Sequence, residues 1–374
     1  MLDTTLILLG AGGSSRFKTT LKKQWLYTDE IPLWLYVAEQ FALSGSFKKI
    51  IIVSTPNEIA FMRNFSLEYE YIVGGENRQE SLSLGLECVD TEYAMVSDIA
   101  RCCVPADMIA RILDARGEGD AIVPILPIVD TLYLNGRPID REKTKIIQTP
   151  QLSRTSLLKK ALKTDRLFTD DSSAIASIGG EVKFVDGSCD AHKLTTIEDL
   201  QKLSCLKSPS SKTLTGFGID IHPFERDKEM FLCGVKIDVD YGFKAHSDGD
   251  VAIHALIDAL LGACGMGDIG ELYPDTDERY NGISSQLLLA NTVERIESFG
   301  YVIGNIDMTI MAQKPRILPY KEAMRDNLSS LLGIRKNFVN IKATTAEKLG
   351  FVGRKEGVTV YAVANLTYLN WKQL

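Results

Sequence analysis

The chain has 374 residues, which at roughly 150 residues per domain predicts two or three domains. Hydrophobic residues make up 45% of it and charged residues 24%, a globular composition that excludes a disordered tail and a small disulfide-stapled domain. The 42 basic and 49 acidic residues give a formal net charge of -7, so we expect neither nucleic acid nor a membrane as partner. Any phosphate-binding site must therefore depend on a local cluster of basic residues and not on the net charge of the protein.

The seven cysteines form an odd set without C-x-x-C spacing, which argues against a disulfide framework and a thiolate zinc site. We therefore expect reduced thiols and a cytoplasmic protein. The apolar run at residues 6–9 is too short for a signal peptide, and no run approaches the roughly 20 apolar residues of a membrane span.

Residues 1–204 alternate short β-rich runs with stretches typical of helices. The runs lie at 6–9, 50–53, 71–73, 94–97 and 121–124. This alternation predicts an α/β domain with a mainly parallel, doubly wound, Rossmann-like sheet and crossover helices.

Residues 205–213 have few apolar side chains, a proline and several serines, a composition typical of a linker. Residues 214–374 then carry β-runs at 214–220, 230–233, 306–312, 339–343 and 357–368, and helical patterns near 248–264, 284–299 and 319–332. We expect an α+β domain with its own core.

A glycine-rich turn follows the first β-run, where missing Cβ atoms let backbone N–H groups approach a phosphate. The turn is neither a Walker motif nor the dinucleotide fingerprint, which requires a third glycine where Ser15 stands. Arg16, Lys22 and Lys23 follow it. These cations suit a nucleoside triphosphate attacked at its α-phosphorus, although a glycine turn with solvated lysines remains the alternative.

Two further segments are expected at the same edge of the sheet. Gly75 and Ser81 come after one strand and open a helix, whose N-terminus suits a base or phosphate. Asp98 ends another strand, where it could bind Mg²⁺ or cap a helix, and the sequence does not decide between these.

Residues 4–203 resemble the 2-C-methyl-D-erythritol 4-phosphate cytidylyltransferases. The shared motifs are Gly10–Arg16, Lys23-Gln24, Gly74-Gly75 with Arg78–Ser81, Asp98–Arg101, Asp130-Thr131, Thr149–Gln151, Thr169–Asp171 and Lys193–Thr195. The resemblance implies that Arg16 and Lys23 stabilise the transition state, that Arg141 and Lys193 position the methylerythritol phosphate, and that Ser81 and Asp98 contact cytidine and Mg²⁺. It implies further substrate contacts at Gly10, Ala11, Gly12, Gly13, Gly75, Arg101, Asp130, Thr131 and Thr149. Leu9, Lys22 and Cys102 replace usual prolines of that family.

Three of the four histidines fall within residues 222–254. Asp220 and His222 stand at i and i+2 of a β-run and so point to one face, and His254 lies off the apolar stripe of a predicted helix. One Asp and two His with an open position are the ligands of a catalytic Zn²⁺, and an unrelated scatter of histidines is the alternative.

The form S-x-x-D at Ser247 to Asp250 predicts a capping box, which places His246 just outside the helix at its positive end. Asp258, one turn after His254, could accept the second ring N–H of that histidine or could be a solvated helix residue.

Residues 214–370 resemble the 2-C-methyl-D-erythritol 2,4-cyclodiphosphate synthases. The shared motifs are Gly218–Phe224, Ala245–His254, Gly267–Gly270, Tyr273–Asp277, Ala312–Pro315 and Lys342–Arg354. The resemblance implies a homotrimer with sites between subunits, Zn²⁺ on Asp220, His222 and His254, transition-state roles for His246 and Thr345, and Mg²⁺ on Glu347. It implies substrate contacts at Ser247, Asp268, Ile269, Gly270, Tyr273, Pro274, Asp275, Thr276, Asp277, Ala312, Gln313, Lys314, Pro315, Arg316, Ile317, Leu318, Thr344, Ala346, Phe351 and Arg354.

Together the resemblances imply a bifunctional isoprenoid-precursor enzyme acting on cytidine nucleotides and methylerythritol phosphate. The substrate must be phosphorylated between the two reactions, and neither half has an ATP-kinase signature, so association with the intervening kinase has no support in the sequence. The alternatives are a nucleotidyltransferase fused to an unrelated zinc hydrolase, and a nucleotide-sensing scaffold that has lost catalysis. A trimeric second half with a dimeric first half would build a larger assembly.

Overall fold

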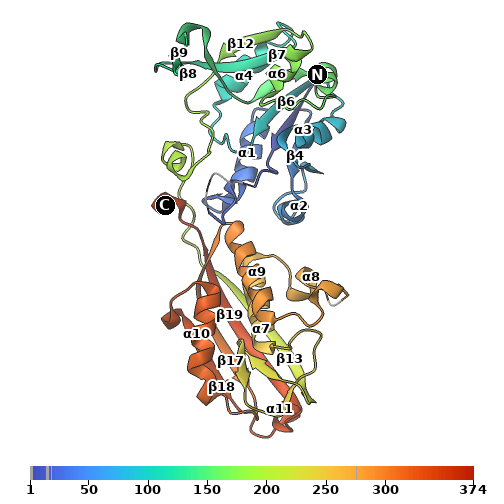
Figure 1. The fold of residues 1–374 in the computed structure, drawn as a ribbon, viewed down its shortest axis with the longest axis vertical. Coiled ribbons are helices and arrows are strands. Elements are labelled where there is room, and N and C mark those ends of the chain that lie inside the picture. The colour runs from blue at the N-terminus through green and yellow to red at the C-terminus, as the bar shows by residue number, and fades with distance from the viewer. Residues whose placement is uncertain (1–2, 14–16, 18, 275) are drawn as a thin grey trace. The chain divides into compact units, whose positions relative to one another are not determined.

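The computed structural model describes residues 3–13, 17, 19–274 and 276–374, drawn in Figure 1. The chain divides into two compact units. The first is Met1–Pro209 with Asn370–Leu374, and the second is Ser210–Leu369. Within the described ranges, no helix combines the length and the apolar character that crossing a bilayer requires.

The first unit is built on a largely parallel sheet with helices on its faces (Figure 1). The strand order is β10-β7-β11-β6-β1-β4-β5, with β12 beside β7. The strands are β1 Thr4–Leu9, β4 Lys49–Ser54, β5 Glu70–Val73, β6 Tyr93–Asp98, β7 Ala121–Pro127, β10 Lys145–Ile147, β11 Gln151–Arg154 and β12 Val182–Asp186. The helices are α1 Leu33–Ala42, α2 Pro56–Met62, α3 Arg78–Glu87, α4 Ala106–Asp114, α5 Thr155–Ala161 and α6 Asp171–Ser177. The predicted α/β class is confirmed, and the predicted runs are strands β1, β4, β5, β6 and β7.

The central strand β1 is buried on both faces, as parallel strands require. It pairs in parallel with β4 and β6, so the carboxyl ends of these three strands meet at one edge of the sheet. Antiparallel β11 interrupts the pattern between β6 and β7, which the sequence did not predict. The glycine turn after β1 and Asp98 at the end of β6 therefore lie side by side.

The second unit is a mixed sheet whose helices pack on one face (Figure 1). The strand order is β16-β13-β19-β17-β18. The strands are β13 Leu214–Arg226, β16 Tyr241–Phe243, β17 Tyr301–Met311, β18 Val339–Thr344 and β19 Gly357–Tyr368, with a separate hairpin of β14 Met230–Leu232 and β15 Val235–Ile237. The helices are α7 Val251–Cys264, α8 Ile269–Leu272, α9 Ser285–Ser298, α10 Lys321–Leu332 and α11 Gly350–Gly353.

Helix α7 packs very closely on β13 because this strand has glycines at the contact. A Cβ on Gly216 would lie 2.0 Å from the carbonyl oxygen of Ala259, and one on Gly218 would lie 2.0 Å from that of Ala255. Only glycine permits this approach. It brings the helix turn that carries His254 against the strand that carries Asp220 and His222.

The last five residues of the chain belong to the first unit. The indole Nε1 of Trp371 donates to the carbonyl oxygen of Tyr27 at 2.6 Å, and the Trp371 side chain is buried. The sequence predicted that all of 214–374 belongs to the second domain. A single tryptophan after a strand carries no local sign of where it docks, so this return could not be predicted.

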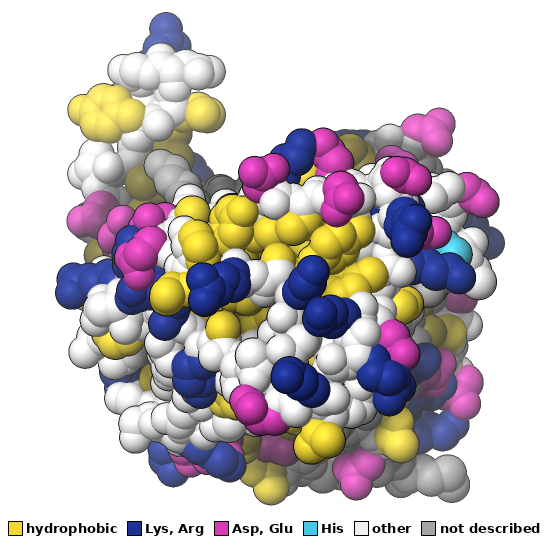
Figure 2. All heavy atoms as spheres, turned by 90° about the horizontal axis from the view of Figure 1, so that it is seen from below, with side chains coloured by type: hydrophobic (Ala, Val, Ile, Leu, Met, Phe, Trp, Pro, Cys, Tyr) yellow, Lys and Arg dark blue, Asp and Glu magenta, His cyan; other side chains and the backbone are white. Residues whose placement is uncertain are grey.

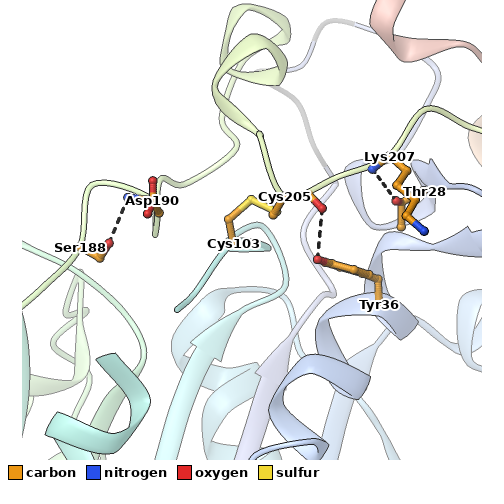
Figure 3. Close-up of a disulfide and its surroundings, with 7 residues drawn as sticks. All are labelled: Thr28, Tyr36, Cys103, Ser188, Asp190, Cys205 and Lys207. Atoms are coloured by element: carbon orange, nitrogen blue, oxygen red, sulfur yellow. Dashed lines mark hydrogen bonds between the residues drawn. A yellow bond between two sulfur atoms is a disulfide. The ribbon is translucent and has the colours of Figure 1, made fainter. Parts of the chain in front are cut away.

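Residues 205–209 also pack on the first unit, although their composition predicted a linker. Figure 3 shows a disulfide between Cys103 and Cys205, whose Cα atoms are 5.7 Å apart. In the same view the Tyr36 hydroxyl donates to the carbonyl oxygen of Cys205 at 3.4 Å, and the backbone N–H of Lys207 donates to Thr28 Oγ1 at 3.0 Å. The expectation that all thiols are reduced is therefore wrong for this structure. An odd cysteine count and missing C-x-x-C spacing say nothing about a pair 102 residues apart.

We expect Trp371→Ala to lower the free energy of unfolding of the first unit by about 3 kcal/mol, because a buried indole and its hydrogen bond are lost. Trp25 and Trp34 lie in the same unit, so their fluorescence during urea unfolding reports the change. The matched control is Gln373→Ala at an exposed position of the same turn. Equal unfolding midpoints for the two variants would contradict docking of the C-terminal segment.

Two candidate active sites

A cavity of about 410 Å³ lies in the first unit at the carboxyl ends of β1 and β6. Most of the predicted residues of this unit line it, namely Gly10, Ala11, Gly12, Gly13, Lys23, Gly75, Ser81, Asp98 and Lys193. Arg16 lies outside the described residues. The predicted convergence of the glycine turn, the helix start and the strand end is confirmed for these positions.

A buried carboxylate holds two cations in this cavity. Lys193 Nζ lies 2.6 Å from Asp98 Oδ2, and Arg78 Nε lies 3.5 Å from Asp98 Oδ1. Burial raises the pKa of Asp98, but the charges of Arg78 and Lys193 outweigh it, so the net shift is downward. Asp98 is therefore ionised near neutral pH, and a second carboxylate, Asp171, holds Arg78 from the other side at 2.8 Å.

Lys23 adds a third cation to the cavity lining. It sits in a 3₁₀ turn, Lys23–Trp25, and its Nζ donates to the carbonyl oxygen of Leu194 at 3.1 Å. The amine therefore lies against the loop that carries Lys193. Lys23, Arg78 and Lys193 outnumber the carboxylates Asp98 and Glu76 of the lining, which suits a polyphosphate.

The start of α3 closes another side of the cavity. Asn77 caps the helix by accepting from the N–H of Glu80 at 2.9 Å. The Ser81 hydroxyl accepts from the N–H of Gly75 at 3.1 Å and so orders the turn before the helix. The positive end of α3 thus points toward the cavity lining.

Five predicted residues of the first unit that the structure describes do not line this cavity, namely Arg101, Asp130, Thr131, Arg141 and Thr149. Arg101 Nε donates to Thr149 Oγ1 at 2.8 Å, so these two residues brace the segment beside the cavity. Asp130, Thr131 and Arg141 lie in the exposed segment around the hairpin of β8 Tyr133–Leu134 and β9 Arg137–Pro138. Arg141 donates there to the carbonyl oxygen of Val129 at 3.1 Å.

A second cavity, of about 490 Å³, lies in the second unit. Its lining includes the predicted residues Asp220, His222, His246, Ser247, His254, Ile269, Gly270 and Tyr273. It also includes Lys244, Asp258, Glu278, Tyr280, Asn281, Ile283 and Leu288. Apart from Asp258, these were not predicted, because nothing in their local sequence marks them.

Asp220, His222 and His254 meet as predicted. His254 Nδ1 lies 3.3 Å and His222 Nε2 lies 3.6 Å from Asp220 Oδ2, and one ligand atom from each residue falls within 4.8 Å of the others. Burial lowers the pKa of His222, so its ring is neutral near pH 7, as a metal ligand must be. One carboxylate and two imidazoles form a donor set that fits Zn²⁺ with an open position.

Hydroxyl groups hold the other ring nitrogen of His254. Its Nε2 lies 2.9 Å from Ser285 Oγ and 3.2 Å from Ser247 Oγ, which turns Nδ1 toward Asp220. Asp258 does not take this role, since its carboxylate accepts from the backbone N–H of Ile269 at 2.8 Å.

The predicted capping box at Ser247 is wrong. Helix α7 begins at Val251, and its N-cap is Asp250, which accepts from the N–H groups of Ala252 and Ile253. The buried Asp250 also accepts from Cys233 N–H at 2.9 Å and from Gly234 N–H. Its carboxylate takes four backbone donors that a serine hydroxyl could not satisfy, so the helix starts there. His246 lies four residues before this cap and is exposed.

Many predicted nucleotide contacts do not line this cavity in the same chain. One group follows the end of β17, namely Ala312, Gln313, Lys314, Pro315, Arg316, Ile317 and Leu318. The other begins at Thr344, the last residue of β18, and continues with Thr345, Ala346, Glu347, Phe351 and Arg354. Thr345 Oγ1 donates to Glu347 Oε1 at 2.7 Å, and both are exposed. Asp268 caps α8, whereas Pro274, Thr276 and Asp277 flank the lining and Asp275 lies outside the described residues.

A cationic cleft at the end of a parallel sheet and an Asp–His–His cluster on a mixed sheet define an enzyme with two sites for phosphate-bearing substrates. Residues 4–205 match the family described as 2-C-methyl-D-erythritol 4-phosphate cytidylyltransferase, and residues 213–367 match the YgbB family. A "Bifunctional enzyme IspD/IspF" from Sulfurovum sp. (strain NBC37-1) is 69% identical over 373 residues, with 100% of both chains covered. One of the same description from Sulfurimonas denitrificans is 55% identical over 370 residues, covering 99% of this chain and 96% of the relative.

The solved structure of the bifunctional IspDF from Campylobacter jejuni matches with a TM-score of 0.92 at 46% identity, covering 99% of this chain and 100% of that one. The chain belongs to the family of bifunctional IspD/IspF enzymes. It transfers CMP from CTP to 2-C-methyl-D-erythritol 4-phosphate and cyclises 4-diphosphocytidyl-2-C-methyl-D-erythritol 2-phosphate with release of CMP.

We expect Gly218→Ala to lower the free energy of unfolding of the second unit by about 1–3 kcal/mol, because α7 must move away from β13. Gly262→Ala is the matched control, since a Cβ at this exposed position of α7 meets nothing within 4 Å. Calorimetry of both variants checks this, and an undiminished transition for Gly218→Ala would contradict the close contact.

Proposed function

We propose that cytidylyl transfer takes place in the first unit, on residues 1–204, at the cavity around Asp98. The backbone N–H groups of Ala11 to Gly13 bind the triphosphate of CTP, because the N–H of Gly10 already donates to the carbonyl oxygen of Val53 at 2.8 Å. Lys23 and Arg16 stabilise the charge that develops on the α-phosphate while a phosphate oxygen of methylerythritol phosphate attacks and pyrophosphate leaves. The observation that supports this most is the set of three cations, Lys23, Arg78 and Lys193, lining one cavity with the glycine turn.

Further roles follow the family resemblance. Lys193 and Arg141 position the methylerythritol phosphate, with Asp130, Thr131, Arg101 and Thr149 nearby, and Gly75 with Ser81 meets the cytosine ring. Asp98 fits poorly as a ligand of Mg²⁺, since Lys193 and Arg78 face its two oxygens. The proposed role of Asp98 is to hold these two cations. Mg²⁺ is instead bound by the phosphates of CTP and reaches the site with the nucleotide.

Replacing Lys23 tests the assignment of cytidylyl transfer to this cavity. We expect Lys23→Ala to lower kcat for cytidylyl transfer by about 10²-fold or more, with a smaller effect on KM for CTP, because transition-state charge loses a partner. Steady-state assays of pyrophosphate release measure it. Lys160→Ala, an exposed lysine of α5, is the control, and a Lys23→Ala enzyme as fast as this control would refute the assignment.

We propose that cyclisation takes place in the second unit, on the part of the predicted domain 214–374 that ends with β19 at Tyr368. Asp220, His222 and His254 would hold Zn²⁺ or a similar divalent cation, which when bound polarises a phosphoryl group. Ser247 and Ser285 keep the His254 ring turned for this purpose. His246 and Thr345 steady the phosphates while the 2-phosphate attacks the β-phosphorus and CMP leaves, and Glu347 offers one oxygen to Mg²⁺ on the diphosphate.

A homotrimer would complete this site between subunits. The cytidine-binding residues 312–318 and 344–354 lie outside the cavity of their own chain, so a neighbouring chain would supply them. Alternate residues of β13 are apolar and exposed on the sheet face opposite α7, with Phe217 60%, Ile219 45% and Ile221 47% exposed. Figure 2 shows a further gathering of hydrophobic side chains, bordered by both basic and acidic side chains. A dimer through the first units would build a larger assembly.

We propose that the partners are the small-molecule substrates and other copies of the chain, in the cytoplasm. Nucleotide and sugar-phosphate substrates support this location. The Cys103–Cys205 bond runs against it, since disulfides are rare in reducing compartments.

Replacing one metal ligand separates the two activities. We expect His222→Ala to lower zinc content from about one ion per chain and to abolish CMP release, because one of three protein ligands is lost. Cytidylyl transfer should stay within about twofold of wild type, since that site uses oxygen ligands and phosphate-bound Mg²⁺. Elemental analysis and both assays on each variant are the measurements.

The matched control is His192→Ala, which replaces the one histidine of the first unit, 2.7 Å from Asp199. This variant should bind as much zinc as the wild-type protein. His246→Ala should keep zinc and lose only rate. Full zinc with full CMP release in His222→Ala would contradict the metal site.

A further inference from the structure

Glu58 is a fully buried carboxylate near the first cavity that the reaction scheme above does not use. It stands at the third position of α2, after the N-cap Thr55, where a glutamate ordinarily remains at the surface and caps the helix. Here it is 0% exposed, and Thr55 makes no side-chain cap. A buried charge is costly unless several donors surround it, so its position requires an explanation beyond capping.

The donors to Glu58 come from two parts of the chain. Ser54 Oγ and Thr55 Oγ1 donate to Oε2 at 3.0 and 2.7 Å, which fixes the carboxylate on the end of β4. Gln24 Nε2 and Trp25 Nε1 donate to Oε1 at 2.6 and 3.0 Å. Lys22 Nζ lies 3.4 Å from the same oxygen.

The three residues that contact Oε1 flank Lys23 in the sequence. Lys22 precedes it, and Gln24 and Trp25 follow it, so one carboxylate oxygen fixes the turn on both sides of the lysine. Gln24 Nε2 also donates to the carbonyl oxygen of Gly10 at 3.0 Å, which ties the same turn to the glycine loop. The lysine amine itself donates to the carbonyl oxygen of Leu194 at 3.1 Å.

We propose that Glu58 is a positioning residue for cytidylyl transfer, which holds the turn of Lys23 in register with the glycine loop through hydrogen bonds to Gln24 and Trp25. The inference rests on the proposed role of Lys23. It assigns to Glu58 no contact with substrate, so its loss should affect the rate more than CTP binding.

Two substitutions of similar volume separate this role from packing and from charge. Glu58→Met keeps volume but removes every acceptor, and we expect kcat for cytidylyl transfer to fall by about 10-fold to 10²-fold with KM for CTP within about threefold. Glu58→Gln keeps an acceptor toward Gln24 and Trp25, because the hydroxyls of Ser54 and Thr55 can accept from its amide, so it should restore kcat to within about fivefold of wild type.

A double variant tests whether the effect passes through Lys23. If it does, Lys23→Ala combined with Glu58→Met should be no slower than Lys23→Ala alone, whereas independent effects would multiply. The control Asp107→Asn removes an exposed carboxylate from the first turn of α4 and should leave kcat unchanged. All variants are made in the full-length chain, with CTP binding by calorimetry to show that the unit is folded.

Wild-type kcat in Glu58→Met, equal losses in the Gln and Met variants, or multiplied losses in the double variant would each overturn the proposal. Should Glu58→Met fail to bind CTP, Trp25→Phe decides, since it removes one donor and keeps an aromatic ring: lower kcat supports the proposal and unchanged kcat overturns it. A Lys23→Ala enzyme of normal rate would instead refute the proposed function. A slow Lys23→Ala with a normal Glu58→Met refutes only the role of Glu58.

Discussion

Buried carboxylates that gather several donors organise both sites of this chain. Glu58 joins the Lys23 turn to the end of β4, and Asp98 holds two cations in the first cavity. Asp250 accepts four backbone N–H groups and fixes the start of α7, the helix that carries His254. Burial raises the pKa of Asp250 to about 6, which reflects the cost of enclosing this charge. Such a carboxylate is tolerated only where its donors are all in place, so each one imposes a defined local geometry.

Features set by local pattern could be predicted from the sequence. The buried run of β1 and the i, i+2 spacing of Asp220 and His222 follow from strand periodicity alone. Interactions between distant segments could not be predicted, because no local pattern marks them. The inward turn of Glu58, the docking of Trp371 on Tyr27 and the pairing of Cys103 with Cys205 are all of this kind. The start of α7 was misplaced because Ser247 and Asp250 are both good caps, and only the contact with Cys233 and Gly234 selects Asp250.

The two cavities differ in the groups that they offer to a phosphate-bearing substrate. The first is lined by lysine and arginine side chains and by the glycine turn, which suits a flexible triphosphate. The second presents one carboxylate and two imidazoles, a ligand set that suits a divalent cation. A bound cation would then interact with the phosphate in place of lysine and arginine side chains. The product of the first reaction must be phosphorylated before it becomes the substrate of the second. Direct transfer of an intermediate between the two sites is therefore not required. Separate units with separate cores are consistent with this independence.

Anomalous X-ray diffraction at the zinc absorption edge, on crystals of the full-length protein, tests the central claim most directly. The claim is that one chain carries two sites and that only the second binds zinc through protein side chains. The predicted result is a single strong peak per chain between Asp220, His222 and His254. Zinc instead at Cys102, Cys103 and Cys205, the other group of potential ligands within 4.8 Å among the described residues, or beside Asp98, would contradict the account.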